Sequence, residues 1–188
     1  PLDKREGILK AFNYADDRIN HMLLKAMIAR KCFDFQLAQR TVAQLKTLRN
    51  TLSTLQQLEL ALEECSLLYT SVHTQTKALS LCRQVFEISK NSLVSAVNGP
   101  ARKKAHRFHS KVSRMLGIWT GELRAESTST VIDKYMDPAI TTTDNEDSKT
   151  SAHFALAKYM DSLYCTYYDR INSAEWHEMV TNRQKYRE

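Results

Sequence analysis

Histidine and cysteine are the residue types of this 188-residue chain most able to bind a metal or attack a substrate, and their spacing supports neither chemistry. His177-Glu178 begins like the zinc motif H-E-x-x-H, but Thr181 stands where the second histidine is required. His106 and His109 are three residues apart, but they lie in a basic run whose positive charge opposes a bound cation. We therefore predict that this segment has no catalytic residue, no metal ligand and no cofactor site of its own.

Nucleotide and disulfide chemistry are also unsupported by the sequence. The four glycines are scattered, whereas a phosphate-binding loop gathers them before a helix, and no protein-kinase catalytic motif occurs. The four cysteines are widely spaced and fall on or beside apolar helical stripes, which is typical of reduced, buried thiols. No apolar run approaches the ~20 residues needed to span a bilayer. We therefore do not predict an enzyme from this stretch.

One basic run is dense enough in charge to bind a partner, and no acid interrupts it. Its simplest interpretation is a solvated outer face, because most of its members fall away from the apolar stripe of the same helix. Two alternatives remain open, which are an acidic protein partner and contact with DNA phosphates. The candidate partner contacts are Arg102, Lys103, Lys104 and Arg107, and the run continues through Lys111 and Arg114.

The elements that carry these residues are predicted to be helices. Apolar residues recur at three- and four-residue steps in every long segment, and the chain has only four glycines and three prolines. The predicted fold class is all-α, a tetratricopeptide- or HEAT-like α-solenoid of about four antiparallel helix pairs. The whole chain, 1–188, is expected to be part of one helical-repeat (FAT-like) domain. Its pairs are expected at 3–48, 52–90, 101–140 and 151–187, with a loop at 91–100 and a flexible loop at 141–150.

The clearest period in the chain lies at residues 52–72. A second apolar side of the same helix is formed there by Leu60 and Leu67. A helix with two apolar sides is expected to be packed between neighbouring helices. The main stripe has 3-4-3-4-3 spacing and consists of Leu55, Leu58, Leu62, Cys65, Tyr69 and Val72.

The centre of the chain, residues 116–140, is predicted to hold the end of one helix, a sharp turn and the start of the next. Trp119 lies on an apolar stripe, and we expect it to be a buried plug that packs against Val131 and Tyr135 across the turn. Pro138 is expected to end or kink the second helix. The predicted structural core comprises Trp119, Phe108, Tyr135, Leu62, Tyr69 and Leu163.

Three stretches also resemble a known family. LGIWTGELRAESTSTVIDKYMDPAI, from Leu116, has a Gly-x-Trp helix end, an acidic turn and a helix with a Tyr-centred apolar stripe. AHFALAKYMDSLYCTYYDRINSAEWHEM, from Ala152, has an Ala-x-Phe-x-Leu-Ala start and a Tyr-rich middle. Together with the pair LQQLELALEECSLLY to LCRQVF, they resemble the FAT-region segment of checkpoint kinases of the ataxia-telangiectasia mutated (ATM) type, in the phosphatidylinositol-kinase-related protein kinase family.

The resemblance implies a helical scaffold and regulatory segment of a DNA-damage checkpoint protein serine/threonine kinase, acting in double-strand-break signalling and telomere maintenance. It implies that the segment packs on the kinase domain and other helical repeats of the same chain, in a nuclear protein that forms a large homodimer. By the same resemblance, ATP and Mg²⁺ belong to the parent kinase and break-sensor adaptor proteins are partners. Direct contact with DNA or a membrane is not expected.

Two other hypotheses remain open. The first is a free-standing tetratricopeptide-like module that binds peptides in its concave groove. The second is a helical DNA-binding protein that uses the basic run. The chain starts with Pro1 in place of Met and its last residues are helix-forming, so we expect a piece of a longer chain, which favours the kinase hypothesis.

Overall fold

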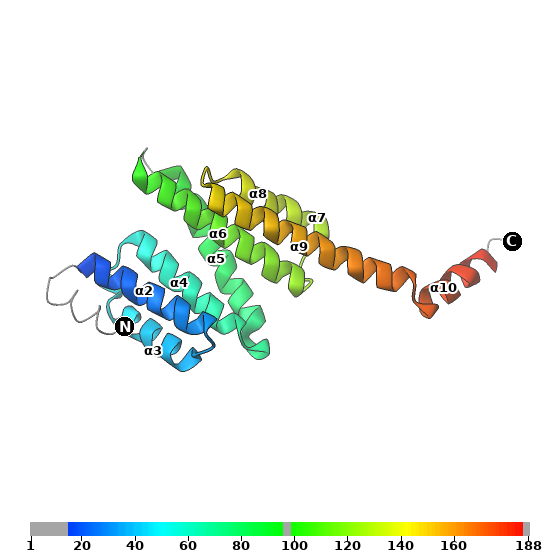
Figure 1. Cartoon of the computed structure of the whole chain (residues 1–188), viewed down its shortest axis with the longest axis horizontal. Coiled ribbons are helices and arrows are strands. Elements are labelled where there is room, and N and C mark those ends of the chain that lie inside the picture. The colour runs from blue at the N-terminus through cyan, green and yellow to red at the C-terminus, as the bar shows by residue number, and fades with distance from the viewer. Residues whose placement is uncertain (1–14, 96–98, 186–188) are drawn as a thin grey trace.

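A computed structural model describes residues 15–95 and 99–185, and every regular element within those ranges is a helix. The prediction of an all-α fold is therefore confirmed for the described residues. The predicted start of the first helix, at residues 3–14, and the last residues, 186–188, lie outside them. Figure 1 shows successive helices packed into one body, from which the C-terminal end of the chain projects.

The first pair of helices consists of α2, Ala15–Lys31, and α3, Phe35–Thr47. The turn between them contains Phe33 at a positive φ of 62°. Asp34 then caps α3, because its carboxylate accepts a hydrogen bond from the amide of Leu37 at 3.1 Å. This turn folds α3 back along α2, so the two helices pack closely.

The second pair is built from α4 and α5. Ser53 and Gln56 close the first turn of α4 with a reciprocal capping box, which fixes where the helix begins. The second helix is longer than predicted, because it continues into the expected loop at 91–100 as far as Ser95. The elements are η1 at Arg49–Thr51, α4 at Thr54–Tyr69, η2 at Val72–Thr74 and α5 at Gln75–Ser95.

The third pair joins α6 to a helix of three consecutive parts. The turn between them ends α6 with Arg124 at a positive φ of 50°, and Ser127 caps the next helix by accepting from the amide of Thr130. The middle part of the second helix is a π-helical turn. The elements are α6 at Pro100–Glu122, α7 at Thr128–Val131, η3 at Ile132–Met136 and α8 at Asp137–Thr141.

The helix does not end at Pro138, as one of the two predicted outcomes required, because it continues to Thr141. The π-turn closes with a bond from the amide of Asp137 to the carbonyl of Ile132. Pro138 then falls in the first turn of α8, where a missing amide donor costs little. A π-turn is rare enough that sequence reasoning does not anticipate it.

Two serines of α6 bind carbonyl groups along this second helix. The hydroxyl of Ser113 donates to the carbonyl of Tyr135 at 2.8 Å, and that of Ser110 donates to the carbonyl of Ala139. Both serines are buried, so these hydrogen bonds hold the second helix of the pair, which contains the π-turn, against α6 in the interior.

The long helix α9, Glu146–Ile171, begins inside the region predicted to be a flexible loop, 141–150. Asn145 caps it by accepting from the amide of Ser148 at 3.0 Å, and Asp147 adds negative charge to its first turn. The prediction was wrong from Glu146 onward because it took polar composition as a loop signal and missed this cap.

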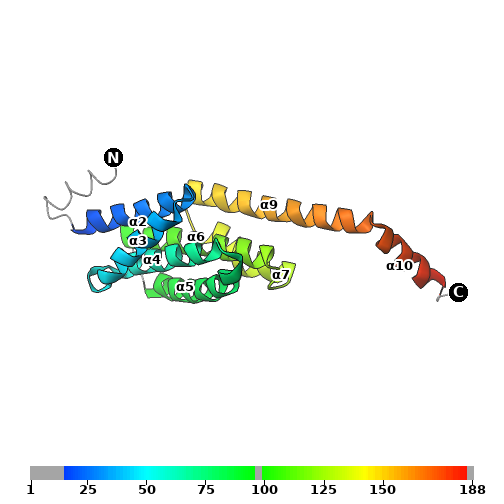
Figure 2. The same ribbon diagram turned by 90° about the horizontal axis from the view of Figure 1, so that it is seen from below.

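The chain beyond the third pair does not form the predicted fourth antiparallel pair at 151–187. The first half of α9 lies along α6 and α8, whereas its second half runs past the body (Figures 1 and 2). The last helix, α10 at Ala174–Lys185, turns away from α9 and does not fold back along it. α9 therefore packs on the third pair instead of on α10.

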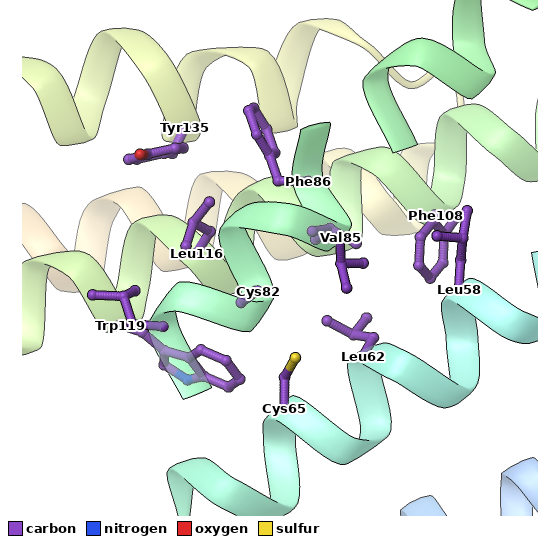
Figure 3. Close-up of a cluster of buried hydrophobic side chains, with 12 residues drawn as sticks. Leu58, Leu62, Cys65, Cys82, Val85, Phe86, Phe108, Leu116, Trp119 and Tyr135 are labelled. Carbon is purple, nitrogen blue, oxygen red and sulfur yellow. The ribbon is translucent and has the colours of Figure 1, made fainter. Parts of the chain in front are cut away.

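The buried residues form two clusters that meet at α4. One cluster lies between α4, α5 and α6 and includes Leu58 and Leu62 (Figure 3), and the other lies between α2, α3 and α4 and includes Leu60. The prediction that this helix has two apolar sides and packs between neighbours is therefore confirmed. Because one helix serves both clusters, the first two pairs and α6 form a continuous body.

Candidate functional site

The basic run occupies the first four turns of α6. Arg102, Lys103, Lys104 and Arg107 are all exposed, whereas Phe108 of the same helix is buried. The solvated-face interpretation describes only part of the run. A cleft of about 760 Å³ opens between α2, α4, α6 and the start of α9, and the basic side chains that line it are Lys104, Arg107, Lys111 and Arg114.

Acidic residues line the same cleft. Glu59 and Glu63 of α4 belong to its lining, as do Asp16 of α2 and Asp147 of α9. Four acids thus accompany four bases, so the formal charge of the lining is balanced. The cleft also has an apolar part, formed by Leu23, Leu24, Met27, Leu55 and Phe108.

The electrostatics of the cleft favour internal pairing. Arg30 holds the buried carboxylate of Glu63 with two hydrogen bonds, from Nε at 2.6 Å and from Nη2 at 3.2 Å. Burial raises the pKa of Glu59 above its ordinary value, and the positive charges of Lys111 and Lys104 oppose that rise. A DNA backbone would meet these carboxylates beside the bases, which makes the cleft poorly suited to phosphate binding.

The predicted core residues have different surroundings. Trp119 is 8% exposed, and Phe108, Leu62 and Tyr135 are also buried, whereas Leu163 of α9 is partly exposed. The sequence expectation for Leu163 assumed a fourth antiparallel pair, and α10 does not cover it.

Trp119 does not pack as predicted. Its ring stacks on Tyr69 of α4, with ring centroids 4.2 Å apart and an angle of 8° between the planes. Tyr135 instead packs edge-on against Phe86 of α5, at 5.5 Å and 79°, on another part of the cluster (Figure 3). Trp119 is therefore buried as expected, but its ring stacks on Tyr69 and joins α6 to the second helix pair, where we expected it to pack against Val131 and Tyr135.

Tyr69 also reaches the end of α6 through its hydroxyl. The hydroxyl donates to a carboxylate oxygen of Glu122 at 2.7 Å. Burial raises the pKa of Tyr69 far above its usual value, and the hydrogen bond and negative charge of Glu122 raise it further. The neutral phenol is therefore the form that holds α4 to α6.

Glu126, in the turn after α6, makes a similar link. It accepts a hydrogen bond from Tyr135 at 2.9 Å and forms an ion pair with Arg83 of α5 at 2.7 Å. The acidic turn thus ties the second and third pairs together. Sequence reasoning noted this acid as part of a motif but could not name Arg83 as its partner, because the two residues are distant in the chain.

One histidine and one serine lie together in the interior. Nδ1 of His109 is 2.8 Å from the hydroxyl oxygen of Ser89, and both side chains are buried. The Ser89 hydroxyl donates to the carbonyl of Phe86 at 2.7 Å, so Nδ1 of His109 must be the donor to that oxygen. The Ser89 hydroxyl thus accepts a hydrogen bond from His109, and its oxygen is buried. An activated serine nucleophile would instead donate to the histidine and be accessible to a substrate.

The side chains that bind metals are dispersed in the part of the chain that the structure describes. No three histidine, cysteine, aspartate or glutamate residues among residues 15–95 and 99–185 are grouped so as to hold an ion. The cysteines there are free thiols, and burial raises the pKa of Cys65 to about 12. No described helix is both long and apolar enough to cross a membrane.

The described part of the chain is helical, and the contacts of Trp119, Tyr69 and Glu126 connect one helix to another. No protein-family model matches the chain. A stretch of 84 residues is 30% identical to the serine/threonine-protein kinase ATM of Arabidopsis thaliana, and it covers 40% of this chain and 2% of that kinase. The chain thus spans a very small part of the length of the protein it is similar to, and part of this helical chain is related in sequence to a protein kinase.

Proposed function

We propose that this chain is a helical scaffold and regulatory segment of a DNA-damage checkpoint protein serine/threonine kinase of the ATM type. The observation that carries the proposal is the 84-residue similarity to ATM kinase. The helical fold supports it. α4 is packed on two sides, and α6 contacts α4, α5, α8 and α9, as helices do in a stack of helix pairs. The chemistry of phosphate transfer would belong to another part of the parent protein.

The finer proposal is that the segment belongs to the FAT region, arranged as an α-solenoid that packs on the kinase domain of its own chain. ATP and Mg²⁺ would bind the kinase domain, and the parent would be a nuclear homodimer that signals double-strand breaks through adaptor proteins and supports telomeres. The exposed apolar residues of α9 suit this proposal, because a scaffold needs surface left for neighbouring elements.

The first experiment identifies the native polypeptide. Antibodies raised against this chain should detect a polypeptide far larger than 21.7 kDa in nuclear extract. The immunoprecipitate should phosphorylate protein substrates, and its activity should rise after double-strand breaks are induced. A native protein no larger than this chain, without kinase activity, would reject the proposal.

The second experiment tests the scaffold role with Trp119→Ala in the full parent. Loosening the Trp119–Tyr69 stack should lower the rate of substrate phosphorylation, because the helices behind the kinase domain are less rigid. The KM for ATP should stay unchanged, since no residue of this segment contacts nucleotide in the proposal. A change confined to the KM for ATP would contradict the indirect role.

A free-standing peptide-binding module is the alternative, and the cleft of about 760 Å³ between α2, α4 and α6 is the observation that favours it. Its balanced charges and the Arg30–Glu63 pair point instead to contacts within the fold. The size of the native polypeptide separates the two functions.

A further inference from the structure

A second groove, of about 490 Å³, lies between α9 and the turn that follows α6. It is the place where α9 leaves the body, next to α7 (Figure 1). Its apolar lining includes Ile118 of α6 and Leu163, Tyr159 and Tyr167 of α9. These side chains are partly or largely exposed, so the groove is open to a partner.

The lining of this groove holds three bases and two acids, a formal charge of +1, whereas the four bases and four acids of the cleft between α2 and α6 sum to zero. Arg124, Lys158 and Arg170 line the groove, and none of them forms an ion pair with a described residue. The groove also holds two acids, Glu122 and Glu126. Glu122 accepts a hydrogen bond from Tyr69, and Glu126 is paired with Arg83. The groove therefore offers three positive charges without an ion-pair partner beside an apolar floor, and one of them, Arg170, also lies over the ring of Trp176 at 5.6 Å from its centroid.

The spacing of the bases indicates whether the groove would bind a compact anion, such as one phosphate group, or an extended anionic segment. Lys158 and Arg170 are twelve residues apart on one helix, which separates their Cα atoms by about 18 Å. Lys158 and Arg170 therefore cannot converge on a single phosphate group. They suit several negative charges distributed along a segment, while Ile118 and Leu163 suit an apolar side chain within it.

Arg124 provides an independent observation. It occupies the left-handed position after α6, with a φ of 50°, where glycine is strongly favoured. The amide of Ala125 bonds to the carbonyl of Thr120 at 3.0 Å and that of Arg124 to the carbonyl of Gly121 at 3.1 Å, so the helix end has its usual closing bonds. An arginine with an exposed side chain thus takes this helix-closing position at the edge of the groove.

We propose that this groove binds an acidic segment of a partner protein that carries a large apolar side chain. The acidic residues pair with Arg124, Lys158 and Arg170, and the apolar side chain lies between Ile118 and Leu163. Arginine and tyrosine are the residue types enriched at protein interfaces, and the groove is rich in both. This inference goes beyond the scaffold function and does not depend on it.

The probe is a displayed library of random 12-residue peptides, selected against the purified 188-residue chain. Peptides that bind should be enriched in aspartate and glutamate and should carry at least one large apolar residue. The most enriched peptide is then synthesised with a fluorescent label, and its Kd is measured by anisotropy. A selected pool with no acidic excess would overturn the proposal.

Arg124→Gly is the decisive variant, because glycine relieves the backbone at that position while removing the charge. We expect its melting temperature to be equal to or above that of the wild type, and its Kd for the peptide to rise at least about tenfold. Lys158→Gln should weaken binding by a similar factor. The control is Lys103→Gln, which also removes one positive charge, but from an exposed position on α6 outside the groove. It should leave the Kd unchanged within about twofold.

Two outcomes overturn the proposal after a peptide has been found. One is equal weakening by Lys103→Gln and Lys158→Gln, which would mean that net charge alone attracts the peptide. The other is tighter binding of a 12-nucleotide single-stranded DNA with the same dependence on Arg124 and Lys158, which would assign the groove to nucleic acid.

Discussion

The body of the molecule and its projecting C-terminal end have the same apolar periodicity but differ in burial. In α4, stripe residues at three- and four-residue steps are buried in two clusters. In α9 the same spacing leaves Met160, Tyr167 and Ile171 about half exposed, and Phe154 is 71% exposed. The comparison shows that helical periodicity identifies which side of a helix is apolar, whereas burial depends on whether another element lies against that side.

The largest expected difference between the two regions is at their tryptophans. Trp119→Ala removes a buried ring stacked on Tyr69 and should lower the free energy of unfolding by about 3–5 kcal/mol. Trp176→Ala, in α10, removes a partly exposed ring that lies under Arg170, and should cost less than about 1 kcal/mol. Urea denaturation followed by circular dichroism measures both. Similar losses for the two variants would mean that α10 is as tightly packed as α6.

Two leucines, one in each region, allow the loss of stability to be compared for side chains without an aromatic ring. Leu62→Ala, in the cluster between α4 and α6, should cost about 2–5 kcal/mol, because the side chain is 2% exposed and leaves a cavity. Leu163→Ala should cost under about 1 kcal/mol, because Leu163 is partly exposed. Both variants are measured in the same denaturation assay. A loss above about 2 kcal/mol at Leu163 would show that α9 is covered in solution by a second molecule, and it should then depend on protein concentration.

Sequence reasoning predicted the helical class and the two-sided packing of α4, because both follow from residue spacing within one element. It did not predict the partner of Trp119, since the Tyr69–Trp119 stack joins residues fifty positions apart. It also did not predict the π-turn before Pro138. The helix that contains this turn accepts hydrogen bonds from the hydroxyls of Ser110 and Ser113, which belong to another helix.

The candidate site shows the same limit. The basic run is visible in the sequence as one group of charges on α6. Its division into members outside the cleft, such as Lys103, and members that line the cleft, such as Lys111, depends on where α4 places Glu59 and Glu63. The second groove was missed altogether, because its bases come from two elements and no run of charge marks them.

The body should lose stability in acid through His109. The pKa of His109 is lowered from 6.5 to about 4, mainly by burial and then by the positive charges of Lys90 and His106, while Glu87 opposes them. The unfolded chain therefore binds a proton between pH 6.5 and 4 that the folded chain does not, so stability falls as the pH falls through this window.

This proton adds at most about 1.4 kcal/mol per pH unit to the pH dependence of unfolding. The measurement is the free energy of unfolding at several pH values, for the wild type and for His109→Gln. The variant should lose this part of the slope while keeping the part due to carboxylates. Equal slopes in the two proteins would show that His109 is protonated in the folded state.

The smallest expected effect separates two adjacent lysines of the basic run. Lys103 is exposed and lines neither cleft, so Lys103→Glu should change the free energy of unfolding by less than about 0.5 kcal/mol. Lys104 lines the cleft, and its charge lowers the pKa of Glu59. Lys104→Glu places a second negative charge beside Glu59 and should cost more than the Lys103 change, up to about 1 kcal/mol. Thermal melts at low and high salt measure both variants, and salt should reduce the difference because the charges are partly exposed. Equal and negligible effects at both positions would mean that the whole run is a solvated face, and that the positive charge of Lys104 near Glu59 contributes nothing to the stability of the body.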